Sequence, residues 1–407
     1  MFYDPIPRHF ISYSATDQKT VRELRGQYDG ILVPGTVAAF QREGTAGFVL
    51  SMSSSETRPP YVIDPRFPLF QQQLPKVKRS HSELAKLLGD ESLACADTWP
   101  SPKDFSDERT TALASSWVKF NLQYRDKQSA KFDKYAKRLG KQLDIAEASG
   151  PQRILAPYFC VSGLDDPWWE KSVALYEASL KACDEKLNVT RVLAADSPTA
   201  LHHLINETAT GDVCIWVSRL NELTTTAQQL SDYGLAIREL KDSNRRSFAL
   251  YGGFFSVLLS AVGLGGASHG IGYGEARDWR ELPRSGPPPS RYYLGTVHRY
   301  VSHDDAHQLW LHNRHLVGDG SDPPPINLHY HDLMLHSVQA RSEEITNYSG
   351  LDLQSSIDRL RSEQQTFLHR LNHNSPSRLV HRIGTRTVGH LETWLEALEE
   401  LKRYSKI

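Results

Sequence analysis

Short apolar runs that end in polar or glycine-containing turns recur along the chain, and each predicts a β-strand. These runs lie at residues 31–34, 47–52, 61–63, 93–96, 154–159, 213–217, 248–251, 269–271 and 292–294. Amphipathic stretches with helical spacing lie between several of them, for example at residues 166–187 and 224–240. Strands that alternate with helices indicate a parallel sheet, so the pattern predicts the α/β class and a TIM-type (β/α)8 barrel.

Nine runs are one more than such a barrel needs. Eight strands close it, so one run is expected to be an edge strand, a hairpin arm or no strand at all. The weakest candidates are residues 47–52 and 292–294. Length fits this reading, because a barrel takes about 250 residues and the chain has 407.

The pattern changes toward the C-terminus. Proline-rich connectors interrupt regular structure at residues 279–291 and 318–325. Beyond them, residues 353–373 and 387–404 have helical apolar spacing with many charges. We therefore expect the barrel over residues 1–300 and a helical C-terminal extension over residues 301–407.

Composition limits the class of protein. The apolar fraction is 39%, and no run approaches the roughly 18 apolar residues of a membrane helix, so we expect a soluble protein with no membrane partner. The N-terminus lacks the basic and apolar regions of a secretory signal. Four cysteines stand far apart without CxxC spacing: Cys95, Cys160, Cys183 and Cys214. We expect reduced core residues rather than a metal site or disulfides, and hence a cytoplasmic protein.

The net charge of the chain does not indicate nucleic-acid binding. The net charge is −1, so any nucleic-acid surface must be local. Three basic segments could supply one, at residues 76–79, 125–141 and 378–386. A solvated helix face is the commoner explanation of any such segment taken alone.

The stretch from residue 248 to residue 279 is the most informative for a site. It reads FALYGGFFSVLLSAVGLGGASHGIGYGEARDW. A strand that stops at Gly252 and Gly253, an uncharged helix and a second strand that begins at His269 predict a buried strand-helix-strand unit. Glycines at the carboxyl ends of strands let a ligand approach the backbone, whereas tight turns and helix packing are the alternative explanation.

Two aspartates are expected at strand ends. Asp64 follows the run at 61–63, and Asp97 follows the run at 93–96. Active sites of TIM barrels lie at the carboxyl ends of the strands, where a carboxylate can act as nucleophile, general base or substrate anchor. An Asx turn or a helix cap is the alternative for either residue taken alone.

Several segments carry a resemblance to a known family. YVIDPRFPLFQ at 61–71 contains Asp64 and then Phe-Gln, and LACADTWPSPKDF at 93–105 contains Asp97 before a Thr/Pro-rich loop. Tyr251-Gly252-Gly253 and GIGYGE at 270–275 are similar to strand ends that read Gln-Gly-Gly and Gly-Leu-Ala-Val-Gly-Glu. RYYLG at 291–295 and INLHYHDL at 326–333 follow in the same order. In these segments, spread over about residues 30–340, the chain resembles the tRNA-guanine transglycosylase superfamily.

The resemblance implies a glycosyltransferase, of the pentosyltransferase kind, that replaces guanine in a nucleic acid by a 7-deazaguanine. Such enzymes use a covalent aspartyl-ribosyl intermediate and no nucleotide cofactor. By this resemblance Asp97 and the backbone of Gly252, Gly253, Gly270 and Ile271 would bind the base. Asp64 would act near the sugar as base or nucleophile. Tyr251 and Glu275 fall in the same substrate-binding segments.

The departures from the family pattern matter too. The zinc site of three cysteines and a histidine is absent, because no cysteine follows Cys214 and Ile326 replaces the histidine. Tyr251 replaces the glutamine before Gly-Gly, which changes the hydrogen-bonding groups offered to a base. Two registers also compete for the nucleophile. Counting strands favours Glu275 or Asp278, whereas counting motifs places it after residue 294, at Asp304, Asp305 or Asp319.

A DNA-directed branch of the superfamily departs from the tRNA enzymes in similar ways, so we favour DNA over tRNA as the target. The implied partners are that nucleic acid, a 7-deazaguanine-type base and, at the protein level, a second copy of the chain or subunits of a modification complex. Two other functions remain open. One is a non-catalytic transglycosylase-like subunit, and the other is an unrelated TIM-barrel enzyme whose glycines at 263–266 and 270–274 hold a phosphorylated small molecule.

Overall fold

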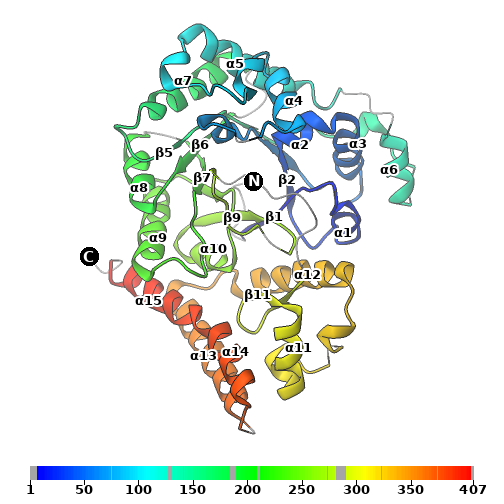
Figure 1. Ribbon diagram of the computed structural model, residues 1–407, viewed down its shortest axis with the longest axis vertical. Coiled ribbons are helices and arrows are strands. Elements are labelled where there is room, and N and C mark those ends of the chain that lie inside the picture. The colour runs from blue at the N-terminus through cyan, green and yellow to red at the C-terminus, as the bar shows by residue number, and fades with distance from the viewer. Residues whose placement is uncertain are drawn as a thin grey trace.

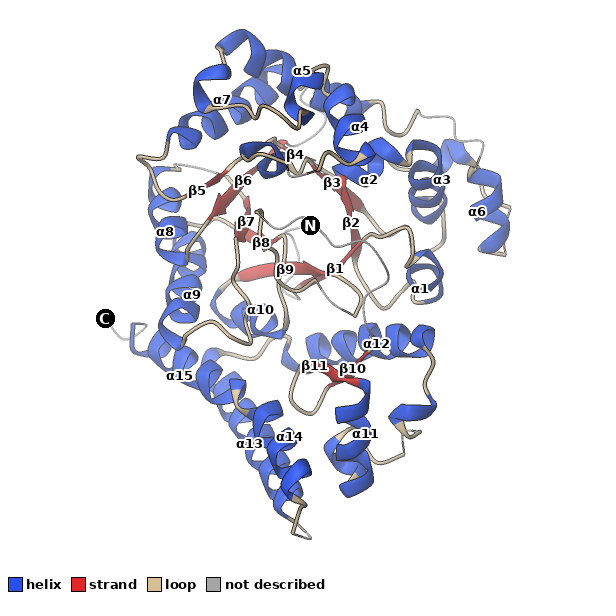
Figure 2. Cartoon of the chain, viewed as in Figure 1, coloured by secondary structure: helices blue, strands red, loops and turns tan. Residues whose placement is uncertain are grey.

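The computed structural model describes residues 7–74, 76–126, 131–140, 142–183, 189–208, 211–272, 274–280, 290–321, 323–373 and 375–404. A closed parallel β-barrel dominates it, with helices around the outside (Figures 1 and 2). The strands of the described barrel are β1 (Arg8–Ser12), β2 (Gly30–Pro34), β3 (Tyr61–Asp64), β4 (Ile154–Leu155), β5 (Cys160–Val161), β6 (Val189–Ala195), β7 (Val213–Val217), β8 (Ser247–Ala249) and β9 (Leu264–His269).

These nine segments form eight positions around the barrel, because β4 and β5 both pair with β6 and together make one interrupted strand. The sheet order is β4-β3-β2-β1-β9-β8-β7-β6-β5, and the pairing of β4 with β6 closes the ring. Every pairing in the ring is parallel. The prediction of a TIM-type (β/α)8 barrel is therefore confirmed.

Side chains fill the barrel interior, so it is a packed core and not a channel. Alternate residues of each strand point inward: on β7, Cys214 and Trp216 join the interior cluster, whereas Val213, Ile215 and Val217 pack against the outer helices. Because both faces are buried, such strands appear in the sequence as continuous apolar runs.

The outer helices follow the strands. They are α1 (Gln18–Glu23), α2 (Gly35–Phe40), α3 (Arg42–Ser53), α4 (Arg79–Leu87), α5 (Asp107–Leu122), α6 (Phe132–Arg138), α7 (Pro167–Ala182), α8 (Pro198–Glu207), α9 (Ala227–Asp242) and α10 (Phe254–Leu258). The side chains of Asp166 and Thr226 cap α7 and α9, and Pro167 occupies the first turn of α7. The predicted helices at these places are confirmed, although residues 184–187 lie outside the described residues. None of the helices described is long and apolar enough to cross a lipid bilayer.

The chain after the barrel forms a hairpin and a set of helices that pack below it (Figure 1). These elements are β10 (Arg291–Leu294), β11 (Arg299–Ser302), α11 (His303–His312), α12 (Tyr330–Tyr348), α13 (Leu353–Asn372), α14 (Arg378–Val388) and α15 (His390–Arg403). α12 packs on α10 and α15 packs on α9, so this part contacts the barrel beside its last two strands.

Two of the predicted strands are not strands, and the strand expected at 269–271 is misplaced, because β9 ends at His269. Residues 47–52 lie in α3, whose buried apolar residues resemble a buried strand because periodicity cannot separate the two. Residues 93–96 lie in and after the 3-10 helix η2 (Glu91–Ala94), which the Asp90 side chain caps. The run at 292–294 lies in β10, outside the barrel, and is the hairpin arm that was one of the alternatives for the ninth run. The strands β1 and β6 were not predicted, because Arg or His interrupts both apolar runs.

Candidate functional site at the barrel mouth

Asp64 stands at the carboxyl end of β3, where its side chain is completely buried. Its Oδ1 accepts hydrogen bonds from the Tyr158 hydroxyl (2.8 Å) and the Arg66 backbone N–H (3.1 Å). Its Oδ2 accepts from the Tyr251 hydroxyl (2.7 Å) and pairs with Nε of Arg66 (2.7 Å). We call Asp64, Arg66, Tyr158 and Tyr251 the mouth cluster. It lies at the end of the barrel where TIM-barrel active sites occur.

The local sequence explains the geometry of the loop after β3. Pro65 stops the strand, and Arg66 takes a left-handed backbone conformation with φ of 60°. That conformation costs about 1–3 kcal/mol for a non-glycine residue, and the bonds from Asp64 to the Arg66 amide and guanidinium offset it. Burial lowers the pKa of Arg66, but Tyr251 and Asp64 raise it by more, so the guanidinium stays charged.

The two tyrosines come from different parts of the barrel. Tyr158 lies between β4 and β5, and Tyr251 follows β8. Burial, together with the Asp64 carboxylate, raises the pKa of both phenols well above the ordinary value. Both therefore remain protonated donors to Asp64 at neutral pH.

A cavity of about 220 Å³ adjoins this cluster at Arg66, the member of the cluster that lines it. Its walls include the guanidiniums of Arg66 and Arg277 and the indoles of Trp216 and Trp279. The two guanidiniums lie 5.4 and 5.6 Å from the centre of the Tyr251 ring. Positive charge beside aromatic faces suits a ligand that carries both an anion and a flat ring.

Other wall residues fit the same chemistry. Lys78 and His81 also line the cavity, and burial with the nearby Lys78 charge lowers the pKa of His81 to about 4. His81 is therefore neutral at physiological pH, and Lys78 adds a third cation to the two arginines.

The backbone amides of the two predicted glycines are bonded within the chain. Gly252 N–H donates to the Ser268 carbonyl (3.0 Å), and Gly253 N–H donates to Glu222 (2.8 Å). Glu222 also accepts from the Phe255 amide (2.8 Å) at the start of α10. A Cβ on Gly253 would lie 2.6 Å from the Glu222 carboxylate. The glycine is required there because the backbone approaches a carboxylate of its own chain.

The second glycine segment leads away from the barrel mouth. β9 ends at His269, and Gly270 N–H donates to the Gly274 carbonyl (3.3 Å). Ile271 is buried in the outer core. Glu275 pairs with Arg341 of α12 at 2.5 Å between its Oε1 and the Arg341 terminal nitrogen. Tyr273, which belongs to the segment at 270–275 that carries the family resemblance, lies outside the described residues.

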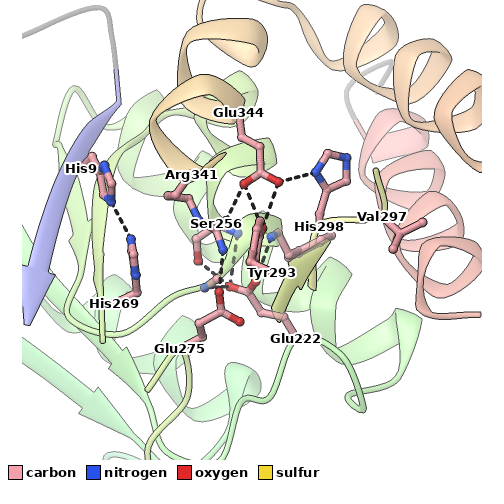
Figure 3. A network of polar contacts seen from close by, with 12 residues as sticks. His9, Glu222, Ser256, His269, Glu275, Tyr293, Val297, His298, Arg341 and Glu344 are labelled. Atoms are coloured by element: carbon pink, nitrogen blue, oxygen red, sulfur yellow. Dashed lines mark hydrogen bonds and ion pairs between the residues drawn. The ribbon is translucent and has the colours of Figure 1, made fainter. Parts of the chain in front are cut away.

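Arg341 belongs to a buried ionic network that joins the barrel to the hairpin and the C-terminal helices (Figure 3). Its guanidinium lies 2.5 Å from Glu275 and 3.5 Å from Glu344. Glu344 accepts hydrogen bonds from the Tyr293 hydroxyl (2.9 Å) and from Nδ1 of His298 (2.6 Å). The other nitrogen of His298 bonds to Glu363 (2.8 Å). We call Arg341, Glu275, Glu344, His298 and Glu363 the interface network.

Burial and the neighbouring charges shift the pKa values of residues in the interface network. Burial, which Arg341 opposes and Glu222 and Glu344 reinforce, raises the pKa of Glu275 to about 7. Burial lowers the pKa of His298, but Glu344 and Glu363 outweigh it and leave the pKa above the ordinary value. His298 therefore carries a proton that both carboxylates stabilise.

Asp97 does not lie at a strand end. It is exposed in a bend after η2, and the neighbouring Ala96 carbonyl accepts a long hydrogen bond from Gln73 (3.4 Å). The structure therefore brings Asp64 and Tyr251 together, leaves Gly253 and Glu275 near the interface network, and places Asp97 on the surface.

The structure shows which strand is the last of the barrel, and this bears on the two positions considered for the nucleophile. β9 completes the ring, so the segment at 291–295 is not a barrel strand. Glu275 and Asp278 are the acids that follow the final barrel strand. Asp278 is paired with Arg219 and accepts from the Arg280 amide (2.9 Å) at the mouth.

The glycines at 263–266 do not form a phosphate cradle with those at 270–274. Gly263 precedes β9 and Gly270 follows it, so they lie at opposite ends of the strand. A Cβ on Gly266 would meet the Arg8 backbone at 2.4 Å. This glycine permits close strand pairing between β9 and β1.

Metal ligands do not gather among the described residues, where no group of three His, Cys, Asp or Glu side chains could hold an ion. The histidines of the C-terminal part have separate partners. His312 bonds to the Leu371 carbonyl (3.0 Å), and His331 bonds to Glu23 (2.7 Å).

Comparison with known proteins adds no identification, because neither a protein-family model nor a curated protein sequence matches this chain.

Proposed function

We propose that this chain is a base-exchange transglycosylase that replaces guanine in a nucleic acid, DNA in preference to tRNA, by a 7-deazaguanine base at the barrel mouth. The mouth cluster carries the proposal. It sets one carboxylate at the carboxyl end of a barrel strand beside a cavity with two guanidiniums and two indoles. A nucleotide flipped out of a strand offers that cavity a phosphate and a flat base.

The reaction needs one carboxylate near the sugar. An oxygen of Asp64 attacks C1′, the bond from C1′ to the guanine nitrogen breaks, and guanine leaves with its electron pair and takes up a proton. The incoming base then attacks C1′ through its deprotonated nitrogen, and the ester bond to Asp64 breaks. No oxidant, reductant or nucleotide cofactor enters this balance.

Asp64 is buried, so the substrate must open the cluster. Arg66 pairs with Asp64 and also lines the cavity, where its guanidinium can bind a phosphate through two hydrogen bonds. A phosphate that draws the Arg66 guanidinium toward the cavity removes the ion pair from Oδ2 of Asp64, which keeps the hydrogen bond from Tyr251. Tyr158 and Tyr251 then hold the carboxylate in place through their hydroxyl groups.

The same burial favours a second candidate, a non-catalytic subunit that binds nucleic acid. All four hydrogen-bonding contacts of Asp64 are made within the chain. In that function Asp64 only positions Arg66 and the two tyrosines for binding. The two functions differ in whether the base is exchanged.

Incorporation of labelled guanine or 7-deazaguanine into DNA and tRNA tests the proposal. We expect the wild-type protein to exchange the base and Asp64→Asn to lose at least about 1,000-fold in rate, because the nucleophile is gone. Asp107→Asn, at an exposed position in the first turn of α5, is the matched control and should keep full activity.

Asp64→Asn leaves Arg66 without its partner, so folding must be measured in parallel by thermal denaturation. Tyr158→Phe keeps the ion pair and removes one hydrogen bond, and we expect about a 10-fold slower exchange from a folded protein. A wild-type protein that binds DNA but exchanges no base in any substrate would contradict the enzyme and support the binding subunit.

A further inference from the structure

A second cavity, of about 720 Å³, lies between the barrel and the C-terminal helices. Its walls come from the loops after β7 and β9, from β11 and α11, and from the end of α14. Figure 1 shows α14 on the side of the red helical arm that faces β11 and α11. The cavity thus separates elements that belong to different parts of the chain.

Three arginines, Arg291, Arg299 and Arg386, line this cavity together with three carboxylates, Glu222, Glu275 and Asp305. Arg291 is exposed, and its side chain makes no hydrogen bond or ion pair with any described residue. Arg299 donates to the Arg386 carbonyl (3.1 Å), and its Nε is buried without a hydrogen-bond partner. Arg386 pairs with Asp305 at 2.7 Å but keeps 65% of its side chain exposed. Glu222 and Glu275 are bonded to Gly253 and Arg341, so the exposed cations at the rim are Arg291 and Arg386.

The positive charge continues along α14. Arg378, Arg382 and Arg386 are four residues apart, so they lie on one face of the helix over about 12 Å. All three are exposed, while Val380 and Ile383 on the opposite face are buried. Arg378 and Arg382 have no ion-pair partner in the described part of the chain. We call Arg378, Arg382 and Arg386 the α14 stripe.

The rim of this cavity is adjacent to the barrel mouth. Ala276 lines the large cavity, and the next residue, Arg277, lines the cavity beside the mouth cluster. The Arg219 amide donates to the Arg277 carbonyl (3.0 Å), which ties the loop after β7 to the same place. A strand bound at the mouth can therefore pass directly onto the rim and the α14 stripe.

We propose that the α14 stripe, with Arg291 at the cavity rim, binds the phosphate backbone of the DNA strand whose target nucleotide enters the barrel mouth. This inference rests on the proposed function and adds the surface that holds the flanking strand. Arginine suits the task because its planar fork donates two hydrogen bonds to one phosphate. Contacts of this kind position a strand without reading its sequence.

Fluorescence anisotropy with a labelled DNA duplex, measured as a function of salt, tests the inference. Each lost phosphate contact lowers the slope of log Kd against log salt by about 0.9. For Arg378→Gln/Arg382→Gln we expect a slope lower by about 2 and at least about a 10-fold weaker Kd at low salt. Arg291→Gln added to this pair should weaken binding further.

The control removes the same charge elsewhere. Lys134→Gln/Lys137→Gln changes two exposed residues of α6, on the far side of the barrel from α14 (Figure 1), and should leave Kd and slope unchanged. All five substituted positions are exposed, and melting temperatures measure whether each variant is folded.

The outcomes separate the two proposals. If the wild-type protein exchanges bases in DNA and the α14 double variant binds DNA with unchanged Kd and slope, the inference is wrong and the proposed function stands. If the wild-type protein binds no DNA, both fail. An equal loss in the α6 control would show only a general charge effect and would also overturn the inference, as would a loss of binding to tRNA with none to DNA.

Discussion

The mouth cluster and the interface network are built from the same chemistry but lie in different settings. Each combines a buried carboxylate, tyrosine hydroxyls and an arginine, and each contains one cation with a left-handed backbone, Arg66 (φ 60°) or His298 (φ 58°). The mouth cluster joins strands of one barrel beside a cationic and aromatic cavity. The interface network joins the barrel to α12, α13 and the β10–β11 hairpin.

The difference teaches that buried charge alone does not identify a site. In the interface network, carboxylates and cations pair with one another across elements that are distant in sequence, so the network holds the C-terminal part on the barrel. Both regions line a cavity: Glu275 and His298 line the 720 Å³ cavity, whereas Arg66 lines the 220 Å³ cavity beside two indoles and a second guanidinium. The cationic and aromatic groups that line the smaller cavity, and not the ion pair or the presence of a cavity, indicate function.

The largest effect should separate the two regions by stability. Arg341→Met leaves Glu275 and Glu344 buried without their cation, and we expect a loss of about 3–5 kcal/mol in the free energy of unfolding. Chemical denaturation measures it, with Arg79→Met, at an exposed pair with Glu83 on α4, as a control that loses less than about 1 kcal/mol. Equal losses of stability in the two variants would contradict the claim that the interface network stabilises the fold.

A smaller loss is expected at the hairpin. His298→Asn keeps the backbone tolerant of a left-handed conformation but removes the hydrogen bonds to Glu344 and Glu363 and the stacking on Phe254. We expect about 3 kcal/mol less stability at neutral pH. Base exchange per folded molecule should stay near the wild-type rate, and a loss as large as that of Asp64→Asn would erase the distinction between the two regions.

The pH dependence of stability should report Glu275. Its pKa is raised to about 7 in the folded protein, so its contribution is fully present below the unfolded pKa and is lost as the pH rises through 7. Between pH 4.5 and 7 the stability of the wild-type protein should therefore fall relative to Glu275→Gln, by about 1–3 kcal/mol. Denaturation curves of both proteins across this range measure it, and parallel pH profiles would contradict the assignment.

The smallest effect is expected at Trp279, which lines the 220 Å³ cavity. Trp279→Ala removes one stacking face and replaces no residue of the mouth cluster, and we expect a loss of about 1–3 kcal/mol in nucleic-acid affinity. Stability should change little, because Trp279 is only half-buried. Trp99→Ala, at an exposed tryptophan beside Asp97, serves as the matched control for binding titrations.

Much of the fold could be predicted from the sequence, because continuous apolar runs such as those of β2 and β7 follow from burial on both faces. The cap at Asp166 with Pro167 located a helix start in the same way. The errors at residues 47–52 and 93–96 arose where a buried helix or a capped turn carries the same apolar run as a strand. β6 was missed because Arg191 interrupts its apolar pattern.

The candidate site was predicted only in part. Asp64 was found because an aspartate after a short apolar run before proline is a visible signal. Arg66 and Tyr158 were missed, although Arg66 follows Asp64-Pro65 directly and Tyr158 lies in a predicted strand. Their roles depend on a left-handed backbone and an interrupted strand, and neither has a sequence pattern of its own. The interface network joins residues more than 60 positions apart, which no local pattern reveals.

A crystal structure of the protein with a short DNA duplex and a 7-deazaguanine base tests the central claim most directly. We expect the base or the flipped nucleotide in the 220 Å³ cavity, stacked on Trp216 or Trp279, with a phosphate within about 3 Å of Arg66 or Arg277. Binding of the base in the 720 Å³ cavity beside Glu275, with the mouth cluster unchanged, would contradict the assignment of the barrel mouth as the active site.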